Sequence, residues 1–126
     1  MTVQDLDTAC AKLGAKLASS GNKDTENSIT KALGVLEEQG VYALFLYLRA
    51  REKEWGEATS NKLASFLRQY PSQQNALLGT NNDLFQALQA LAGDLDKLLF
   101  ARDLLHRALV YARYHAKAAQ VAGDKA

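Results

Sequence analysis

The chain has 126 residues, of which 48% are hydrophobic, 8% aromatic and 23% charged, a size and composition that suit one domain with its own core. The lone cysteine, Cys10, excludes an intramolecular disulfide. The formal net charge is +1, so the charge of the whole molecule does not indicate a strongly acidic or a strongly basic partner.

The first part of the chain carries apolar residues at three- and four-residue spacing, which predicts an N-terminal helix and turn over residues 1–22. This stripe consists of Val3, Leu6, Cys10, Leu13 and Leu17. The polar segment Ser19–Asn22 is expected to end the helix. Because charged and amide residues interrupt the apolar ones, no signal-peptide core is visible, and we expect a cytoplasmic protein.

A second helix is predicted after this turn, with Asp24 or Thr25 as its N-cap. Its two sides are expected to be a buried stripe of Ile29, Leu33 and Leu36 and a solvent side of Glu26, Glu37 and Glu38.

Gly40 precedes the densest apolar run of the chain, Val41–Leu48. Read alone, this run is compatible with a buried strand. It continues into residues 49–54, which favour helix, and the chain offers no second β-rich segment with which a strand could pair. We therefore predict a central helix that is hydrophobic nearly all round. The run is far shorter than the roughly 20 residues that span a bilayer, so no membrane partner is expected.

Trp55-Gly56 is interpreted as a turn, and Thr59 or Ser60 as the cap of the next helix. That helix carries Leu63, Phe66 and Leu67, and it is predicted to end at Tyr70-Pro71 because proline cannot continue a helix. Residues 72–82 are polar and contain glycine, which predicts a loop with a short helical piece.

Asn82 is the predicted cap of a short helix that Gly93 stops, and its apolar side is Leu84, Phe85, Leu88 and Leu91. Asp94 then caps a long basic C-terminal helix over residues 94–121, followed by a frayed tail at 122–126. The whole chain, residues 1–126, is thus predicted to be an all-α, single-domain bundle of five to six helices.

Residues for catalysis, metal or cofactor binding do not form a recognisable pattern. Cys10 lies on an apolar stripe and is interpreted as a core residue rather than a nucleophile. His106 and His115 lack the spacing that places two imidazoles on one metal ion, and no Gly-rich phosphate loop follows a strand. The sequence therefore predicts a protein that is not an enzyme, with no metal, no cofactor and no small-molecule substrate.

The last helix concentrates positive charge, with five basic residues against Asp103 alone between Lys97 and Lys117. On a helical wheel of 100° per residue, its side chains fall into three sectors. The core sector is Leu98, Ala101, Leu105, Ala108 and Ala112, the cationic sector is Arg102, His106, Arg113 and Lys117, and the third sector is Phe100, Arg107, Tyr111 and Tyr114.

Two interpretations of the cationic sector carry equal weight. Basic groups neutralise phosphates and neighbouring aromatic rings stack on bases, which predicts nucleic-acid binding. Basic residues also suit the C-terminal half of any helix, where they complement its dipole. In the third sector, Arg107, Tyr111 and Tyr114 are candidate contacts to a protein partner. A second basic cluster of Arg49, Arg51 and Lys53 reads more simply as a solvated charged turn, because Glu52 and Glu54 lie between its members.

The segments Val35–Arg49 and Ala108–Lys117 resemble the small helical subunit of type III-B (Cmr-type) CRISPR RNA-guided effector complexes. That family has a glycine followed by a hydrophobic helix that ends in a basic residue, as in Gly40–Arg49 here. Its closing helix has an Ala-Leu, aromatic and Arg pattern, similar to Ala108-Leu-Val-Tyr-Ala-Arg-Tyr-His-Ala-Lys117. The resemblance covers roughly residues 28–118. A proline that usually precedes the glycine-led helix is missing, since Val35-Leu36 stands there.

The resemblance implies a non-catalytic subunit that acts in antiviral defence. Several copies would stack head to tail beside other CRISPR effector subunits, with basic faces toward the guide RNA and target RNA. Carried over by region and charge, the implied RNA-binding residues are Arg49, Arg51, Arg102, His106, Arg113 and Lys117. The alternative from the residues themselves is a helical protein–protein adaptor with no nucleic-acid role.

Overall fold

The computed structural model describes residues 3–18, 22–51, 53–72, 75–79 and 81–125, and it confirms the predicted all-α, single-domain fold. The described residues form six helices. These are α1 (Val3–Leu17), α2 (Lys23–Gln39), α3 (Val41–Arg51), α4 (Lys53–Leu67), α5 (Leu84–Ala92) and α6 (Leu95–Lys125). The predicted turn residues Ser19, Ser20 and Gly21, and the side chain of Val3, lie outside the described part.

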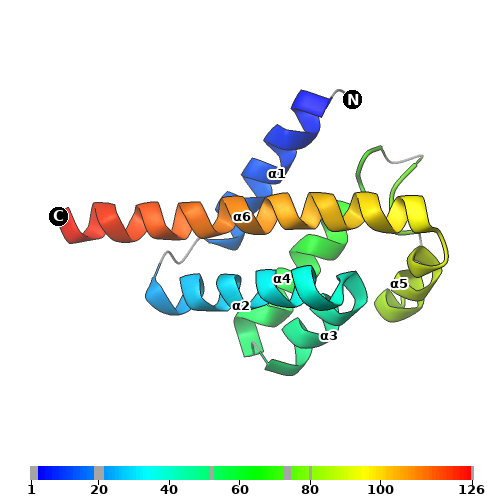
Figure 1. The fold of residues 1–126 in the computed structure, drawn as a ribbon, viewed down its shortest axis with the longest axis horizontal. Coiled ribbons are helices and arrows are strands. Elements are labelled where there is room, and N and C mark those ends of the chain that lie inside the picture. The colour runs from blue at the N-terminus through cyan, green and yellow to red at the C-terminus, as the bar shows by residue number, and fades with distance from the viewer. Residues whose placement is uncertain (1–2, 19–21, 52, 73–74, 80, 126) are drawn as a thin grey trace.

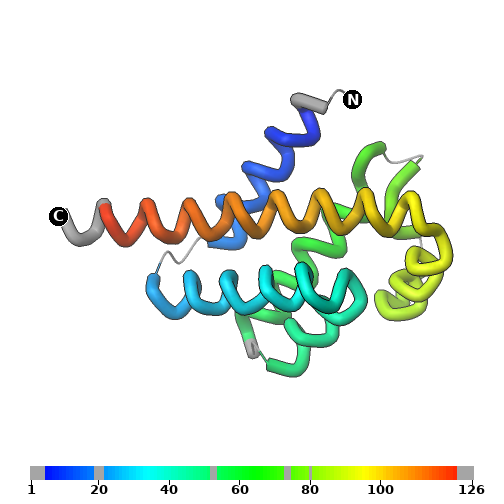
Figure 2. The backbone as a smooth tube through the Cα atoms, viewed as in Figure 1, coloured from blue at the N-terminus to red at the C-terminus, as the bar shows by residue number. Residues whose placement is uncertain are grey.

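Helix α6 runs along the whole length of the molecule, and the other helices are arranged against it (Figure 1). Helix α2 lies beside it in the antiparallel sense, so that Glu37 faces Arg102 and Glu26 faces Gln120. Helix α1 crosses α6, α3 packs beside α2, and α4 packs against α3 and reaches α1. Helix α5 turns back at the end where α6 begins (Figure 1). The tube in Figure 2 shows α6 as one uninterrupted rod.

The core is continuous, and α6 supplies much of it. Its buried side chains are Ala101, Leu104, Leu105, Ala108, Leu109, Ala112 and Ala116. Four of these seven are alanines, whose small side chains let neighbouring helices approach closely. The predicted stripes of α1 and α2 are buried as well, from Leu6 to Leu17 and from Ile29 to Leu36.

Helices α1 and α6 come closest at Gly14. A Cβ atom placed on Gly14 would lie 2.7 Å from the Cβ of Tyr111, 2.8 Å from the carbonyl oxygen of Ala108 and 2.8 Å from the amide nitrogen of Ala112. Two of these three atoms belong to the backbone of α6 and cannot turn aside. Only glycine therefore fits at this crossing.

Gly40 makes the corner between α2 and α3 without an intervening loop. Its φ of 101° is a value that side-chain-bearing residues rarely adopt, and its N–H bonds the Leu36 carbonyl at 3.1 Å. Helix α3 begins at the next residue, so the predicted helical interpretation of Val41–Leu48 is confirmed. The helix is less central than predicted, because Leu46 is 49% exposed.

Two predicted N-caps are wrong by one to three residues. Asn22, not Asp24 or Thr25, caps α2, since its side-chain oxygen accepts from the Thr25 amide at 2.8 Å. Asp83, not Asn82, caps α5. Asp83 has an extended backbone, and its carboxylate accepts a hydrogen bond from the Phe85 amide at 3.1 Å. The predicted cap of α6 is supported by a 3.2 Å bond from the Lys97 amide to Asp94.

The predicted turn at Trp55-Gly56 is wrong, because both residues lie inside α4. Trp55 packs on the core and donates its indole N–H to the Leu17 carbonyl at 3.2 Å, which ties α4 to the end of α1. Thr59 and Ser60 are consequently buried in mid-helix rather than acting as caps. The helix ends at Leu67, shortly before Pro71. In the part of residues 72–82 that is described, the predicted short helical piece is absent.

Helix α6 continues through Lys125, four residues past the predicted end at Val121. The described part of the predicted tail at 122–126 is therefore helical.

Replacing Gly14 by alanine is expected to destabilise the protein by about 1–3 kcal/mol, because the new methyl group would push α1 away from the α6 backbone. Gly34→Ala is the matched control. Nothing lies within 4 Å of a Cβ at Gly34, so alanine there should be neutral or stabilise α2 by up to about 1 kcal/mol. Urea unfolding followed by circular dichroism measures both. Equal stability of the two variants would contradict the close crossing.

Candidate nucleic-acid interface

The structure divides the cationic sector of α6 into two halves with different surroundings. In the first half, Arg102 donates from Nη2 to the carbonyl oxygen of Glu37 at 2.7 Å. His106 Nε2 lies 3.6 Å from a carboxylate oxygen of the same residue, Glu37. Glu37 is in the last turn of α2, where backbone carbonyls have no partner within their own helix. This half therefore fastens α6 to the end of α2.

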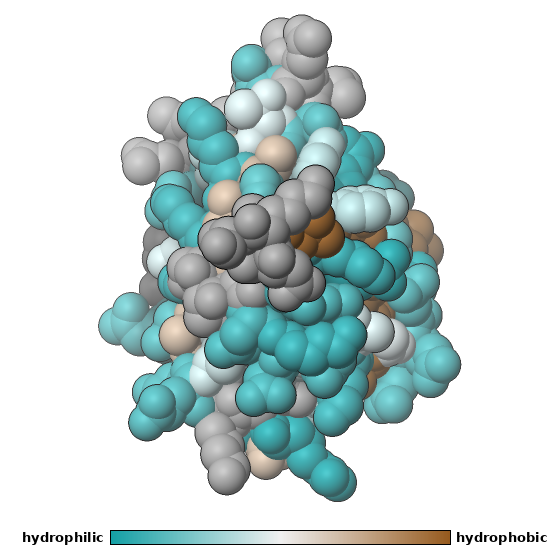
Figure 3. Space-filling view, turned by 90° about the vertical axis from the view of Figure 1, so that its left-hand side faces the viewer, coloured by the Kyte–Doolittle hydropathy of each residue, from teal (hydrophilic) through white to brown (hydrophobic). Residues whose placement is uncertain are grey.

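The second half, Arg113 and Lys117, makes no ion pair within the described part of the chain. Both residues line a hollow of about 220 Å³ between α2 and α6, together with Glu26, Thr30 and Tyr114. Lys117 is exposed and Arg113 is half-buried. Viewed from the end where α6 finishes, the described surface is largely hydrophilic, with several small hydrophobic patches (Figure 3).

Glu26 is the one carboxylate of this hollow, and the prediction that it lies on the solvent side of α2 is wrong. It is 8% exposed, and its carboxylate accepts from Gln120 Nε2 at 2.6 Å. Lys23 Nζ lies 3.9 Å from the same oxygen. Glu26 is therefore satisfied by groups other than Arg113 and Lys117, and those two cations remain open to an outside anion.

The third sector of α6 lies mostly against α1. The Tyr111 hydroxyl donates to Asp7 at 2.8 Å, and this hydrogen bond raises the pKa of Tyr111 above its ordinary value. Arg107 reaches Asp7 at 3.8 Å and Asp103 at 3.2 Å. Two of the three residues predicted to bind a partner protein are thus placed in contacts within the chain.

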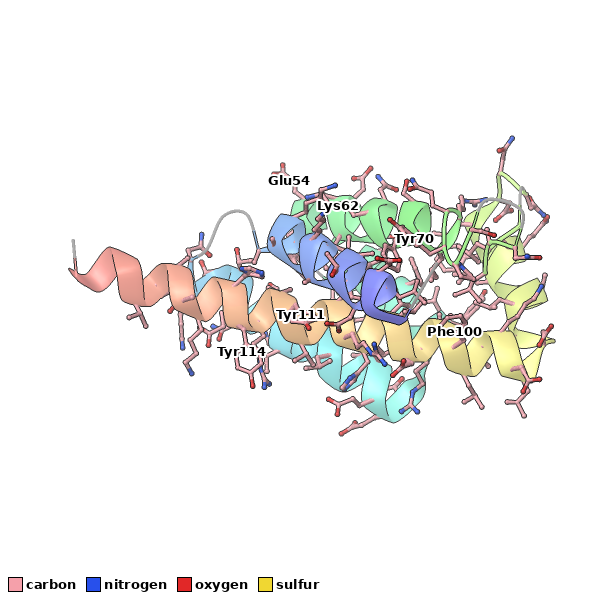
Figure 4. The ribbon with its side chains drawn as sticks, turned by 90° about the horizontal axis from the view of Figure 1, so that it is seen from above. Glu54, Lys62, Tyr70, Phe100, Tyr111 and Tyr114 are labelled. Carbon is pink, nitrogen blue, oxygen red and sulfur yellow. The ribbon has the colours of Figure 1, made fainter. Side chains whose placement is uncertain are left out.

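Tyr114, the third of these residues, is 63% exposed and lies at the hollow with Arg113 and Lys117 instead. Figure 4 labels Tyr111 and Tyr114 on successive turns of α6. The structure thus separates Tyr114 from Arg107 and Tyr111 and places it with the cationic sector. Phe100, from the same predicted sector, packs against the core.

The remaining candidates, Arg49 and Arg51, lie in the last turn of α3. The Arg49 guanidinium lies over the ring of Phe85, 5.1 Å from its centroid, which joins α3 to α5 through a cation–π contact. Both arginines are exposed, whereas the side chain of Lys53 lies outside the described part. In Figure 1 this end of α3 lies beyond α2 as seen from α6, so the structure does not bring Arg49 and Arg51 together with Arg113 and Lys117.

Cys10 is fully buried at the crossing of α1 and α6, with its Sγ 3.6 Å from the Leu104 carbonyl. Burial raises the pKa of the thiol to about 11, despite the opposing effect of Arg107. The thiol is therefore protonated at neutral pH and shielded from reagents. Among the residues that the structure describes, no cluster of three or more His, Cys, Asp and Glu side chains could hold a metal ion.

In comparisons with known proteins, no family model, no curated protein and no solved structure matches this chain significantly. Within the described ranges, none of the helices combines the length and the apolar character needed to cross a membrane.

Cys10 is expected to react with an aromatic disulfide reagent far more slowly in the native protein than in the protein unfolded by guanidinium at the same neutral pH. The reason is that both the protonation and the burial of the thiol must be overcome before a thiolate can attack. Absorbance of the released thiol dye measures the rate. A native rate that matched the unfolded one would contradict the position of Cys10.

Proposed function

We propose that this protein is the non-catalytic small subunit of a type III CRISPR RNA-guided effector complex, acting in the cytoplasm. The observation that carries the proposal is the pair of cations, Arg113 and Lys117, on the long closing helix. They line a hollow beside Glu26 but form no ion pair with it or with any other described residue. These cations belong to one of the two segments that resemble the family. In the other segment, Gly40 precedes helix α3, whose last turn carries the exposed Arg49 and Arg51.

Phosphate contacts suit this geometry better than recognition of base sequence. Arg113 and Lys117 follow each other by one helical turn, so their head groups can reach neighbouring phosphates of one strand. The exposed ring of Tyr114 adds a surface on which an unpaired base next to the duplex can stack. A subunit with such contacts holds a guide–target duplex through its backbone and reads no sequence.

The charge balance of the chain is compatible with stacked copies. A net charge of +1 keeps the repulsion between neighbouring copies small, while the positive charge stays local. A single copy then offers few phosphate contacts, and a row of copies multiplies them.

A helical protein–protein adaptor is the second candidate, and the exposed apolar residues of α6 favour it. Leu95 and Leu99 are 66% and 52% exposed on consecutive turns of that helix. Such residues are typical contacts at protein interfaces, and they do not by themselves call for RNA.

The two candidates differ in what copurifies with the tagged protein from its native host. The effector subunit is expected to bring down large CRISPR subunits together with short guide RNAs that have repeat-derived ends. Sequencing of the RNA and mass spectrometry of the proteins measure this. A clean protein partner without RNA would overturn the first candidate in favour of the adaptor.

Within an assembled effector complex, the double variant Arg113→Glu/Lys117→Glu should weaken target-RNA binding about tenfold or more. It should also make the plot of log affinity against log salt concentration less steep, by the amount expected for the loss of about two phosphate contacts. The control Lys31→Glu/Lys97→Glu changes the net charge equally, at two exposed lysines that do not line the hollow. Filter binding at several salt concentrations measures both variants. Equal losses in the two would show that total charge, and not this site, governs binding.

A further inference from the structure

A second hollow lies between α1 and α4, away from the basic residues of α6 and α3. It has a volume of about 320 Å³, which falls within the range of pockets that hold small organic ligands. Its polar and aromatic lining comprises Lys16 from α1 and, from α4 and the residues after it, Asn61, Lys62, Ser65, Phe66, Gln69 and Tyr70. Figure 4 labels Lys62 and Tyr70 next to α1.

The lining of this hollow contains two lysines and no carboxylate. In contrast, three other hollows formed by the described residues each include acidic side chains, namely Glu37 and Asp103, Glu54 and Glu57, or Glu26. The α1–α4 hollow is therefore more favourable to an anion than these three, since no acidic group in its wall offsets the two ammonium groups.

Neither lysine of this hollow forms an ion pair with an acidic side chain among the described residues. Lys62 Nζ donates to the carbonyl oxygen of Lys16 at 3.3 Å, which offsets the partial negative charge at the end of α1 and uses one of its three N–H bonds. Lys16 makes no ion pair with any described residue. Both groups therefore retain donors for a phosphate.

Tyr70 supplies a planar surface at the same hollow. Its ring stacks on Phe66 with centroids 4.5 Å apart and an interplanar angle of 25°. Phe66 is buried and fixes the inner face of the pair, whereas Tyr70 is half-buried and reaches the hollow. A third ring added to this stack would gain the interaction that bases make with aromatic side chains.

We propose that the α1–α4 hollow binds one nucleotide unit of single-stranded nucleic acid. Lys16 and Lys62 contact the phosphate, and the base stacks on Tyr70. The amides of Asn61 and Gln69 lie in the same wall and can bond the base edge. None of these residues belongs to the sites on α3 or α6, so this inference goes beyond the proposed function and is independent of it.

The combination of groups favours a nucleotide over an acidic peptide. Lysines alone would accept either ligand, because both carry negative charge. The stacked aromatic pair beside them adds little for a flexible carboxylate side chain but matches the flat face of a base.

The test uses the full chain carrying Arg113→Gln and Lys117→Gln, so that the hollow between α2 and α6 does not mask the second one. Binding of a fluorescein-labelled oligouridylate is followed by fluorescence anisotropy at low salt. Lys16→Glu and Tyr70→Leu are each expected to raise the Kd roughly tenfold. Lys31→Glu, the charge-matched control on α2, should stay within about twofold because Lys31 lies outside the hollow.

Tyr70→Phe keeps the stacked ring and should bind more tightly than Tyr70→Leu. Thiouridine cross-linking to the chain with an intact Tyr70, mapped by mass spectrometry, gives a readout that does not depend on whether Tyr70→Leu folds. Cross-links at Tyr70 or its neighbours would support the proposal. No oligouridylate binding, cross-links confined to α6, or equal losses in Lys16→Glu and Lys31→Glu would overturn it. A labelled polyglutamate peptide that binds in place of the RNA and is lost with Lys16→Glu would also overturn it, in favour of an acidic protein partner.

Discussion

The close crossing of α1 over α6 is the contact on which the rest of the structure depends. The missing side chain at Gly14 lets two helix backbones approach, and this approach in turn brings the Cys10 sulfur within 3.6 Å of the Leu104 carbonyl. It also puts Asp7 within reach of Tyr111 and Arg107. Because α6 is held in this way on one flank and by α2 on the other, its outward side is fixed along nearly the whole molecule.

This arrangement explains why four basic residues on one helix do different things. Arg102 and His106 point toward the end of α2, where Glu37 offers both a carbonyl and a carboxylate. About three turns away along α2 lies Glu26, but Gln120 and Lys23 already contact that carboxylate. Arg113 and Lys117 are left facing solvent, and the position of acidic residues on α2 determines which part of the cationic sector is available to a ligand.

Much of the fold followed from the sequence because helical spacing and end signals are local properties. The stripes of α1 and α2, the break at Gly40 and the cap at Asp94 needed no knowledge of tertiary contacts. The predictions for Trp55-Gly56 and Glu26 are wrong because contacts with distant residues hold these side chains in the interior. Trp55 donates to the Leu17 carbonyl, and Glu26 accepts from Gln120. A helical wheel likewise separates the sectors of α6, but it cannot show which helix packs against each sector. The hollow between α1 and α4 had no sequence signal, since Lys16 and Tyr70 are brought together only by the packing of two helices.

The crossing at Gly14 also has a consequence for synthesis of the protein on the ribosome. Cys10 and its partner carbonyl at Leu104 are 94 residues apart, so α1 emerges long before the residues that cover it. Until α6 follows, α1 can pack only against α4, and the nascent chain leaves much of the apolar side of α1, with Leu6, Leu13 and Leu17, without its main neighbour. Contacts of such large sequence separation form late and slow the completion of folding. During that interval, chaperones that bind exposed apolar helices can reach the nascent chain. The interval ends when α6 is made and covers the apolar side of α1.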